Sequence, residues 1–596
     1  MHKSILFLLI LFVLTGIYSV SSCTNTTKEK STNFSEFINR NIDTTLLKLN
    51  QLDSFAKQKK SFQYLAEKFT EGRFAYKKIE SVVEYYFQGL TKRINGPALP
   101  DVKTDDNQVW PPHGFQVLEQ LIYSPLNDSL YAVLQNEINV LMTDFNFVKT
   151  NLAQTTILPR HNAELVQHQL IRIATIGITG ADAPLSKLSL QEAAFALKGL
   201  KTIESFTDTL QNINYANAIA YLERNTNFDS FNRMEFIQNY LMPLSEQHFI
   251  KHANVLVNDS FAKPFTGSLS DLLKGKKINP DYFTAYAVSQ TNLAKVELGK
   301  KLFFETQLSK TNKISCATCH KPDLYFTDGL AKANDFVHGG ILVRNTPTLY
   351  YASLQNNQFY DLRSNYLEDQ INEVMKNSSE FNFSSAGIAT KIIKNDTYKK
   401  LFSEAFSTTD SISGTEVRNA IAAFIRSLNK FSSSFDEYMN GDKQKLTSEE
   451  ISGFNLFAGK AKCATCHFIP FFNGTIPPWY NKTESEIIGV PTFVAWQNAT
   501  IDKDLGRYNL NKLEELKYAF KTPTVRNIEK TAPYMHNGAF KNLEDVVEFY
   551  HKGGGVGIGI NLPFQSLPFD SLILNHSEKK AIVAFMKTLT DKKIAY

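Results

Sequence analysis

One five-residue word, Cys-Ala-Thr-Cys-His, stands twice in this chain of 596 residues, at 316–320 and at 463–467. The chain has five cysteines, and these two words contain four of them; the fifth is Cys23. No cysteine is left over to form a structural disulfide, so the thiols of the two words require another chemical explanation.

The spacing C-x-x-C-H is the attachment signal of c-type haem, in which the two thiols add to the vinyl groups and the next histidine reaches the iron. A thioredoxin-like redox pair would need a strand-helix context, and a zinc site would need a second pair of ligands. The two words therefore predict two covalently bound haem c groups with His320 and His467 as the proximal iron ligands. The attachment residues are Cys316, Cys319, Cys463 and Cys466.

The N-terminus has the pattern of an export signal. A short basic region is followed by an apolar stretch from Ile5 to Val20, which is short for a membrane anchor and is interrupted by polar and small residues. Residues 20–23, Val-Ser-Ser-Cys, resemble a bacterial lipobox, which implies lipidation of Cys23 after removal of a signal peptide over 1–22. A solvated tether over 23–35 would follow. We therefore expect a periplasmic protein, lipid-anchored to a bacterial membrane, most simply the outer membrane.

The net charge of +5 is small for this length, and no dense block of Lys and Arg occurs. A nucleic-acid partner is therefore not expected.

Residues 36–275 are expected to form a helical domain, because apolar residues recur there at helical spacing. A proline-rich segment over 97–112 indicates a loop between helices. The simplest interpretation of this region is a helical bundle for docking or scaffolding. The clearest apolar stripe comprises Phe62, Leu65, Phe69, Tyr76, Ile79, Val83 and Tyr86.

The segment 114–123 resembles the G-x-H-x-x-E signature of imelysin-like proteins, which are helical and linked to metal handling. Gly114 and Glu119 match the signature, whereas Gln116 takes the histidine position. An amide is a poor metal ligand compared with imidazole, so the resemblance implies the helical fold and leaves metal binding in doubt.

Two further segments each open with an apolar and aromatic cluster before the repeated word, so we expect one domain over 276–445 and another over 446–596. Both are followed by longer motifs: FTDG (326–329), RNTPTL (344–349), FYDLRSNYLEDQ (359–370), NSSEF (377–381), and the stretch 520–555 containing FKTPTVRN and APYMHNG.

Together these motifs resemble the bacterial dihaem cytochrome c peroxidase and MauG-like family over about residues 290–590. The resemblance implies a mainly α fold, with the N-terminal helical bundle followed by two class I cytochrome c-like haem domains. It also implies that the first haem meets hydrogen peroxide while the second transfers electrons.

The resemblance places Gln370 and Glu380 over the first haem, with Glu380 as the acid-base group. A carboxyl group in a haem pocket can move a proton between the peroxide oxygens if its pKa is suitable. Tyr360 stands where the family usually has a tryptophan between the haems, which implies an electron relay. The alternative for Tyr360 is a packed aromatic side chain.

The resemblance also implies further iron ligands. His338 is a candidate for the removable ligand of the first haem, which MauG-like members do not need. Tyr550 is the candidate sixth ligand of the second haem, with Met535 as its rival. Tyrosinate is a hard anionic donor that stabilises ferric iron, whereas a thioether favours ferrous iron.

One calcium ion is expected between the haem domains. Asn345, Thr531 and Pro533 match the family positions that hold it, and oxygen donors of this kind suit calcium.

The sequence thus predicts an oxidoreductase of the cytochrome-c peroxidase type that takes electrons from a small redox protein, a cytochrome c or a cupredoxin. One alternative is MauG-like oxidation of side chains in a partner protein. Another is a non-catalytic dihaem lipoprotein for electron transfer or docking.

Overall fold

The computed structural model describes residues 33–125, 127–206, 213–256, 263–284, 287–407, 411–568 and 571–593. The chain divides into two compact units. Unit 1 comprises 1–98, 112–169 and 182–226, and unit 2 comprises 99–111, 170–181 and 227–596. The predicted signal peptide, Cys23 and most of the predicted tether lie outside the described residues. Residues 33–35, the end of that tether, already belong to the first helix.

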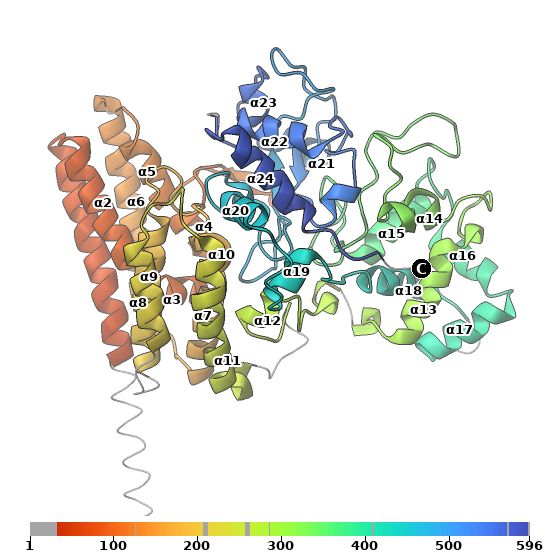
Figure 1. Cartoon of the computed structure of the whole chain (residues 1–596), viewed down its shortest axis with the longest axis horizontal. Coiled ribbons are helices and arrows are strands. Elements are labelled where there is room, and N and C mark those ends of the chain that lie inside the picture. Colours follow the sequence, from red (N-terminus) through yellow and green to blue (C-terminus); the bar gives the residue numbers. More distant parts are fainter. Residues whose placement is uncertain are drawn as a thin grey trace, which may run out of the picture. The chain divides into compact units, whose positions relative to one another are not determined.

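Unit 1 is built from helices (Figure 1). They are a helix over 33–57, α2 (Phe62–Lys77), α3 (Glu80–Tyr86), α4 (Gln88–Asn95), α5 (Phe115–Ile122), α6 (Asp128–Leu152), most of α7 (Pro159–Arg172), α8 (Ser189–Ser205) and α9 (Ile213–Arg224).

Aromatic rings join three of these helices. The Tyr76 ring of α2 lies 5.4 Å from the Phe115 ring of α5 and 5.7 Å from the Phe145 ring of α6, measured between centroids. All three side chains are fully buried. Ring pairs at this separation add to the free energy gained by burying apolar area, so they fix the packing of α2 against α5 and α6.

Unit 1 also buries charge. Arg73 donates to Glu192, with Nη2 at 2.9 Å from Oε2, and Lys77 Nζ lies 2.6 Å from both Glu80 Oε1 and Asp182 Oδ2. The positive Arg73 and Lys77 hold the pKa of Glu192 below its usual range against the opposing effect of burial. A buried ion needs such partners, so this network specifies how α2 meets α8 and the loop before it.

Unit 2 contains the remaining elements. In chain order they are β1 (Asp101–Lys103), β2 (Gln108–Trp110), η1 (Ile173–Gly177), α10 (Arg233–Phe236), η2 (Ile237–Leu241), α11 (Met242–Leu256), α12 (Leu269–Leu273), η4 (Pro280–Phe283), η5 (Ala287–Ser289), α13 (Leu293–Phe304), η6 (Thr306–Leu308), α14 (Cys316–Cys319), η7 (Pro322–Leu324), α15 (Leu367–Lys376), α16 (Ser385–Ile392), α17 (Asp396–Phe406), α18 (Gly414–Arg426), α19 (Ser434–Met439), α20 (Ser448–Phe457), η8 (Cys463–Thr465), β3 (Ser485–Ile487), α21 (Tyr508–Asn511), η9 (Glu514–Leu516), β4 (Ala519–Lys521), η10 (Ile528–Lys530), α22 (Leu543–His551), α23 (Gly554–Gly557) and α24 (His576–Lys587).

The strands form two short antiparallel hairpins. In the first, Asp101 pairs with Trp110 and Lys103 with Gln108. In the second, Ser485 pairs with Lys521 and Ile487 with Ala519. The expected mainly α fold is confirmed, while the predicted loop over 97–112 contains the first hairpin.

Two helix pairs repeat the same close crossing, α13 with α18 and α20 with α24. A Cβ on Gly299 would lie 1.8 Å from the Ala420 carbonyl oxygen, and one on Gly453 would lie 2.0 Å from the Ala581 carbonyl oxygen. No side chain fits at either crossing, so only glycine permits it. Each glycine opens a G-x-x-L-F word, which leads into one copy of the repeated motif.

The predicted apolar stripe divides between two helices. Leu65, Phe69 and Tyr76 are buried on α2, and Val83 is buried on α3. Phe62, at the start of α2, is 47 % exposed, because the first turn of the helix projects beyond the core. The domain boundaries expected at 275 and 445 stay predictions. The two compact units are a coarser division of the chain, at other positions.

Among the described residues, no helix is both long and apolar enough to cross a membrane.

Unit 2 contains a buried ion pair whose disruption should be costly. Arg526 donates two hydrogen bonds to Asp436, at 3.0 and 2.9 Å, and both side chains are fully buried. Asp436→Ala leaves the guanidinium without its counter-charge, so we expect the free energy of unfolding to fall by about 3–5 kcal/mol. Denaturant unfolding followed by haem absorbance measures this.

The matched control is Glu514→Ala, which breaks the exposed Glu514–Lys517 pair of 3.3 Å. Its expected cost is below about 1 kcal/mol. Equal losses in the two variants would contradict the assignment.

Candidate haem sites

The same backbone hydrogen bond occurs within each copy of the repeated word. The amide of His320 donates to the Cys316 carbonyl at 2.9 Å, and the amide of His467 donates to the Cys463 carbonyl at 2.9 Å. The first copy forms the short helix α14 and the second the 3₁₀ turn η8, which follows Lys462 at a positive φ of 58°. Either turn brings the two thiols and the imidazole of its word into one neighbourhood.

Backbone carbonyls orient both imidazoles. His320 Nδ1 lies 2.9 Å from the Phe326 carbonyl oxygen, and His467 Nδ1 lies 3.2 Å from that of Phe472 and 3.0 Å from that of Pro523. A carbonyl can only accept a hydrogen bond, so Nδ1 carries the proton in both rings and Nε2 keeps its lone pair. This is how iron-ligating histidines are usually held.

The electrostatics agree with this role. Burial lowers the pKa of His320 and lowers that of His467 to about 4, so both rings are neutral. All four cysteines of the words are free thiols. Each motif thus has two thiols that form no disulfide, next to a neutral imidazole whose Nε2 carries no proton. This arrangement fits the attachment and ligation of haem c.

Two prolines, each in a Thr-Pro-Thr segment, contribute backbone carbonyls to the sites and were not predicted from the sequence. The Pro523 carbonyl accepts from His467, and the Pro347 carbonyl accepts a hydrogen bond that raises the pKa of His320. Pro347 lies in Thr-Pro-Thr 346–348 and Pro523 in Thr-Pro-Thr 522–524, so the word occurs once after each motif. That repetition was the signal available in the sequence.

Glu380 is close enough to the first pair of thiols for its charge to act on both of them. Burial, followed by the negative charges of Glu380 and Asp328, raises the pKa of the Cys319 thiol to about 12. Burial also raises the pKa of Glu380 itself, against a hydrogen bond of 2.6 Å from Asn377 Nδ2 to Oε2. The structure therefore places Glu380 near the first motif, and its carboxyl group stays protonated up to a higher pH than usual.

Gln370 is half-buried on α15, the helix that precedes the turn carrying Glu380. Its neighbour Glu368 faces inward and accepts from Arg426 at 2.6 Å. The role of Gln370 over the first haem stays a prediction.

Tyr360 links the flanks of the two motifs. Its hydroxyl donates to Asn345 Oδ1 at 3.3 Å, and its carbonyl accepts from the Lys521 amide at 2.7 Å. Burial raises the pKa of the phenol, so the hydroxyl stays protonated at neutral pH. Asn345 follows the first motif and Lys521 follows the second, which places Tyr360 at the junction of the two segments.

Tyr550 lies on α22, close to the second pair of thiols. Burial raises its pKa, and the next contributions come from Cys466 and Cys463. Met535, its rival, is half-buried at a positive φ of 74°. The structure thus brings Tyr550 to the second motif, and the identity of the sixth ligand stays a prediction.

His338 stands in an exposed loop. Its side chain is 57 % exposed, and Nδ1 lies 3.1 Å from Asp335 Oδ2. The pKa of Asp335 falls to about 2, chiefly because its carboxylate accepts from the His338 amide. The predicted role of His338 as a removable ligand stays open, with its imidazole held by Asp335.

The residues expected to hold calcium come from two adjoining segments. The Asn345 amide donates to the His536 carbonyl at 2.7 Å, and Asn345 Nδ2 donates to the Leu330 carbonyl at 2.7 Å. Thr531 and Pro533 lie a few residues before His536. Calcium binding by this set stays a prediction.

At the third position of the imelysin-like motif in unit 1, Gln116 stands in place of a metal-binding histidine. Gln116 Nε2 donates to the Asn95 carbonyl at 2.8 Å, and Glu119 accepts from the Ser186 amide at 2.9 Å. Burial raises the pKa of Glu119. Both side chains thus form hydrogen bonds with the backbone of neighbouring segments.

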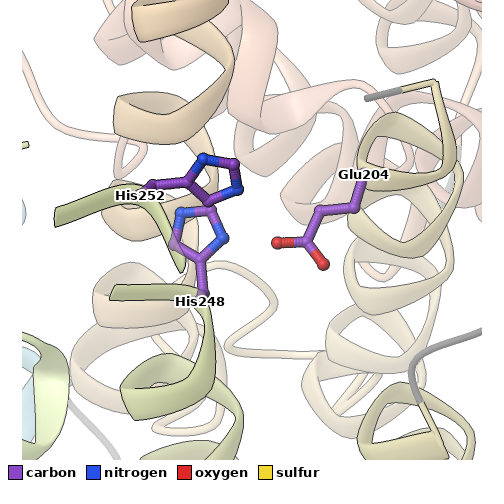
Figure 2. Close-up of side chains that lie close together, drawn as sticks. All are labelled: Glu204, His248 and His252. Atoms are coloured by element: carbon purple, nitrogen blue, oxygen red, sulfur yellow. The ribbon is translucent and has the colours of Figure 1, made fainter. Parts of the chain in front are cut away.

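Unit 2 carries a further pair of histidines, shown in Figure 2. The rings of His248 and His252, one turn apart on α11, have centroids 4.8 Å apart, and α11 departs from helical geometry at His252. Glu204, also labelled there, belongs to unit 1.

Comparison with known proteins gives consistent matches over the second half of the chain. The family described as di-haem cytochrome c peroxidase matches residues 293–444. The methylamine utilization protein MauG of Methylorubrum extorquens is 33% identical over 297 residues, covering 50% of this chain and 78% of that protein. The cytochrome c551 peroxidase of Nitrosomonas europaea is 34% identical over 307 residues, covering 51% of this chain and 82% of that protein.

Among solved structures, a MauG-like protein associated with microbial copper homeostasis is similar at 27% identity and a TM-score of 0.45, over 52% of this chain and 92% of that one.

Each repeated word should carry one haem. Cys463→Ala/Cys466→Ala removes the thiols of the second word, so we expect one covalent haem per chain instead of two, measured by pyridine haemochrome and by mass under denaturing conditions. Cys316→Ala/Cys319→Ala is the matched variant and should also leave one. Two haems retained in either variant would contradict the assignment.

Proposed function

The chain belongs to the family of dihaem cytochrome c peroxidases and MauG proteins, and from this we propose that it reduces hydrogen peroxide at the first haem with electrons delivered through the second. Membership makes it an oxidoreductase and implies two c-type haems. The observation that carries the finer proposal is the proximity of Glu380 to the thiols of the first motif.

Glu380 is proposed to move the proton. A haem held by Cys316, Cys319 and His320 would supply the iron chemistry that reduces peroxide. Glu380 would take a proton from one peroxide oxygen and return it to the other, which would leave as water. Because its pKa is raised, the Glu380 carboxyl can both accept the proton and give it up. Asn377 orients the carboxyl by donating a hydrogen bond to Oε2.

Tyr360 is proposed to relay electrons from the second site to the first. Its position between Asn345 and Lys521 supports this, because these residues flank different motifs. A phenol with a raised pKa loses its proton when it is oxidised, and the hydrogen bond to Asn345 Oδ1 orients the hydroxyl. Relay through Tyr360 should therefore be coupled to loss of the phenolic proton.

Tyr550 is proposed to close the second iron. The contributions of Cys466 and Cys463 to its raised pKa support it over Met535. As a hard anionic donor it would stabilise ferric iron and keep peroxide away. The first iron is proposed to stay open at rest, a proposal supported by the exposure of His338 and its contact with Asp335.

MauG-like oxidation of side chains in a partner protein is the second candidate function. The tyrosine at position 550, in place of the methionine of classical peroxidases, favours it, and MauG itself is among the relatives.

Further parts of the proposal concern the surroundings of the haems. We propose one calcium ion held by Asn345, Thr531 and Pro533, a small cytochrome c or cupredoxin as electron donor, and a periplasmic location with a lipid anchor at Cys23. The adjoining backbone segments at Asn345 and His536 support the calcium site, and the N-terminal pattern supports the anchor.

Substitution of Glu380 tests the proposal. Glu380→Gln keeps the shape of the side chain and removes its capacity to accept a proton, so steady-state peroxide turnover should fall by about 100-fold or more while both haems stay attached. In the unsubstituted protein, turnover should decline as the pH falls through an apparent pKa above the ordinary glutamate value of about 4.3, because the protonated carboxyl cannot act as base.

Glu404→Gln, an exposed position on α17 of the same haem domain, is the matched control and should keep full turnover. Undiminished turnover in Glu380→Gln would refute the assignment. A protein that turns over no peroxide in any form, yet shows reversible redox behaviour, would favour electron transfer alone.

A further inference from the structure

A tyrosine and an aspartate form a buried pair in unit 2 that the proposed mechanism does not use. The Tyr351 hydroxyl donates to Asp591 Oδ2 at 2.7 Å, and both residues are buried. The same hydroxyl accepts a hydrogen bond from the Phe431 amide at 2.9 Å. A phenol–carboxylate contact of this length is a strong, charge-assisted hydrogen bond. The phenol of Tyr351 thus has a fixed orientation and a defined proton acceptor.

Asp591 serves only as an acceptor in its side-chain contacts. Its Oδ1 accepts from the Ser432 amide at 2.8 Å and from the Ser432 hydroxyl at 3.2 Å. Its Oδ2 accepts from Tyr351 and from Asn527 Nδ2, which lies at 3.0 Å. A carboxyl group whose two oxygens both accept is in the ionised form, so Asp591 can take a proton from the phenol.

Arg526 covers the Tyr351 ring. Its guanidinium carbon lies 5.0 Å from the ring centroid, and the guanidinium pairs with the buried Asp436 at 2.9 Å. Arg526 contributes one positive charge, and Asp436 and Asp591 contribute one negative charge each. The buried cluster around Tyr351 therefore has a net charge of −1.

Tyr351 is connected to the histidine of the first motif through neighbouring aromatic residues. Tyr350 precedes it in the chain, and the Tyr350 ring lies 5.3 Å from the ring of Phe326, measured between centroids. The Phe326 carbonyl is the group that orients His320. Packed aromatic side chains shorten the distance that an electron must cross in one step, so this contact gives a path between Tyr351 and the first site.

A second path leads to the histidine of the other motif. The Arg526 guanidinium that covers Tyr351 lies 5.5 Å from the ring centroid of Phe472. The Phe472 carbonyl accepts a hydrogen bond from His467 Nδ1 at 3.2 Å. Tyr351 is therefore linked to residues that support both haem sites.

We propose that Tyr351 is a redox-active residue that stores one oxidising equivalent as a neutral phenoxyl radical, with Asp591 as its proton acceptor. The inference rests on the proposed reduction of peroxide at the first haem, which supplies the oxidant. Tyr351 gives one electron to the haem that peroxide has oxidised, its O–H bond breaks, and the proton moves to Asp591 Oδ2. An electron that a donor protein delivers later restores the phenol, and the proton returns from Asp591.

The charge balance favours oxidation at this position. Burial raises the pKa of Tyr351, so the phenol carries its proton before it is oxidised. Loss of an electron, with transfer of the proton to Asp591, changes the net charge of the cluster from −1 to 0. A buried phenol that lost an electron without a base beside it would become a cation, which apolar surroundings strongly disfavour.

The comparison with Tyr360 separates two roles. The Tyr360 hydroxyl donates to the amide oxygen of Asn345 at 3.3 Å, whereas the Tyr351 hydroxyl donates to a carboxylate at 2.7 Å. An amide oxygen is a far weaker base than a carboxylate. Tyr360 therefore suits brief passage of an electron, and Tyr351 suits storage of the oxidising equivalent.

Tyr480 provides a matched control. It is also fully buried in unit 2, and its ring lies 5.2 Å from that of Phe471. Within the part of the chain that the structure describes, its hydroxyl has no hydrogen-bond partner. No base is placed to receive its proton, so Tyr480 should not be oxidised.

The test uses the full-length protein with both haems attached and no electron donor. It is mixed with hydrogen peroxide, frozen rapidly and examined by EPR, while the haem absorbance is followed in parallel. We expect the signal of a tyrosyl radical in the unsubstituted protein and in Tyr480→Phe. In Tyr351→Phe and Asp591→Asn the signal should be at least about tenfold weaker, because no buried phenol can then lose both its electron and its proton. Peroxide should change the haem absorbance in every variant.

Tyr351→fluorotyrosine, with the fluorine on the ring, keeps the hydroxyl and its hydrogen bonds. It serves if Tyr351→Phe or Asp591→Asn does not fold. The fluorine nucleus should split the EPR signal, which would assign the unpaired electron to this ring. A radical signal without that splitting would overturn the proposal.

The outcomes distinguish this proposal from the proposed function. Haem oxidation by peroxide without a tyrosyl radical, or with a radical that persists in Tyr351→Phe, would overturn the storage site and leave peroxide reduction standing. An undiminished signal in Asp591→Asn would overturn the assignment of Asp591 as proton acceptor. A haem absorbance that peroxide leaves unchanged would overturn the proposed function and this inference together.

Discussion

The hydrogen bond from the Nδ1 of each motif histidine to a backbone carbonyl is the constraint on which both haem sites depend. It fixes the tautomer, leaves Nε2 bare for an iron ligand bond, and ties each motif to a proline that follows it in the chain. The acceptors Phe326 and Phe472 both have positive φ values, 59° and 51°, which turn their carbonyls toward the rings. Identical motifs thus receive similar support.

What differs between the sites is supplied by the segments that fold back over them. The charge of Glu380 acts on the first pair of thiols, and the thiols of the second pair act on Tyr550. Between them, Arg344 binds Asp361 and Asp504 at 2.6 Å each, which joins the flank of the first motif to that of the second and holds Tyr360 at the junction. The ion pairs and the Tyr360 contacts join the flanks of the two motifs within unit 2.

Much of this arrangement was accessible from sequence. Cysteine arithmetic predicted the attachment residues, and the family resemblance of the ordered motifs predicted Glu380 and Tyr550, because covalent chemistry and long motifs leave few alternatives. The roles of these residues stay predictions. The carbonyls of Pro347 and Pro523 were not predicted, since backbone groups leave no residue-type signal beyond the repeated T-P-T word.

The central claim is that two identical motifs hold two haems of different accessibility, the first open and the second closed by a protein ligand. Cyanide binding to the fully oxidised protein, followed by EPR and by titration, tests it most directly. The account predicts one cyanide bound per chain, with the spectrum of one haem unchanged. Binding of cyanide to both haems, or to neither, would contradict it.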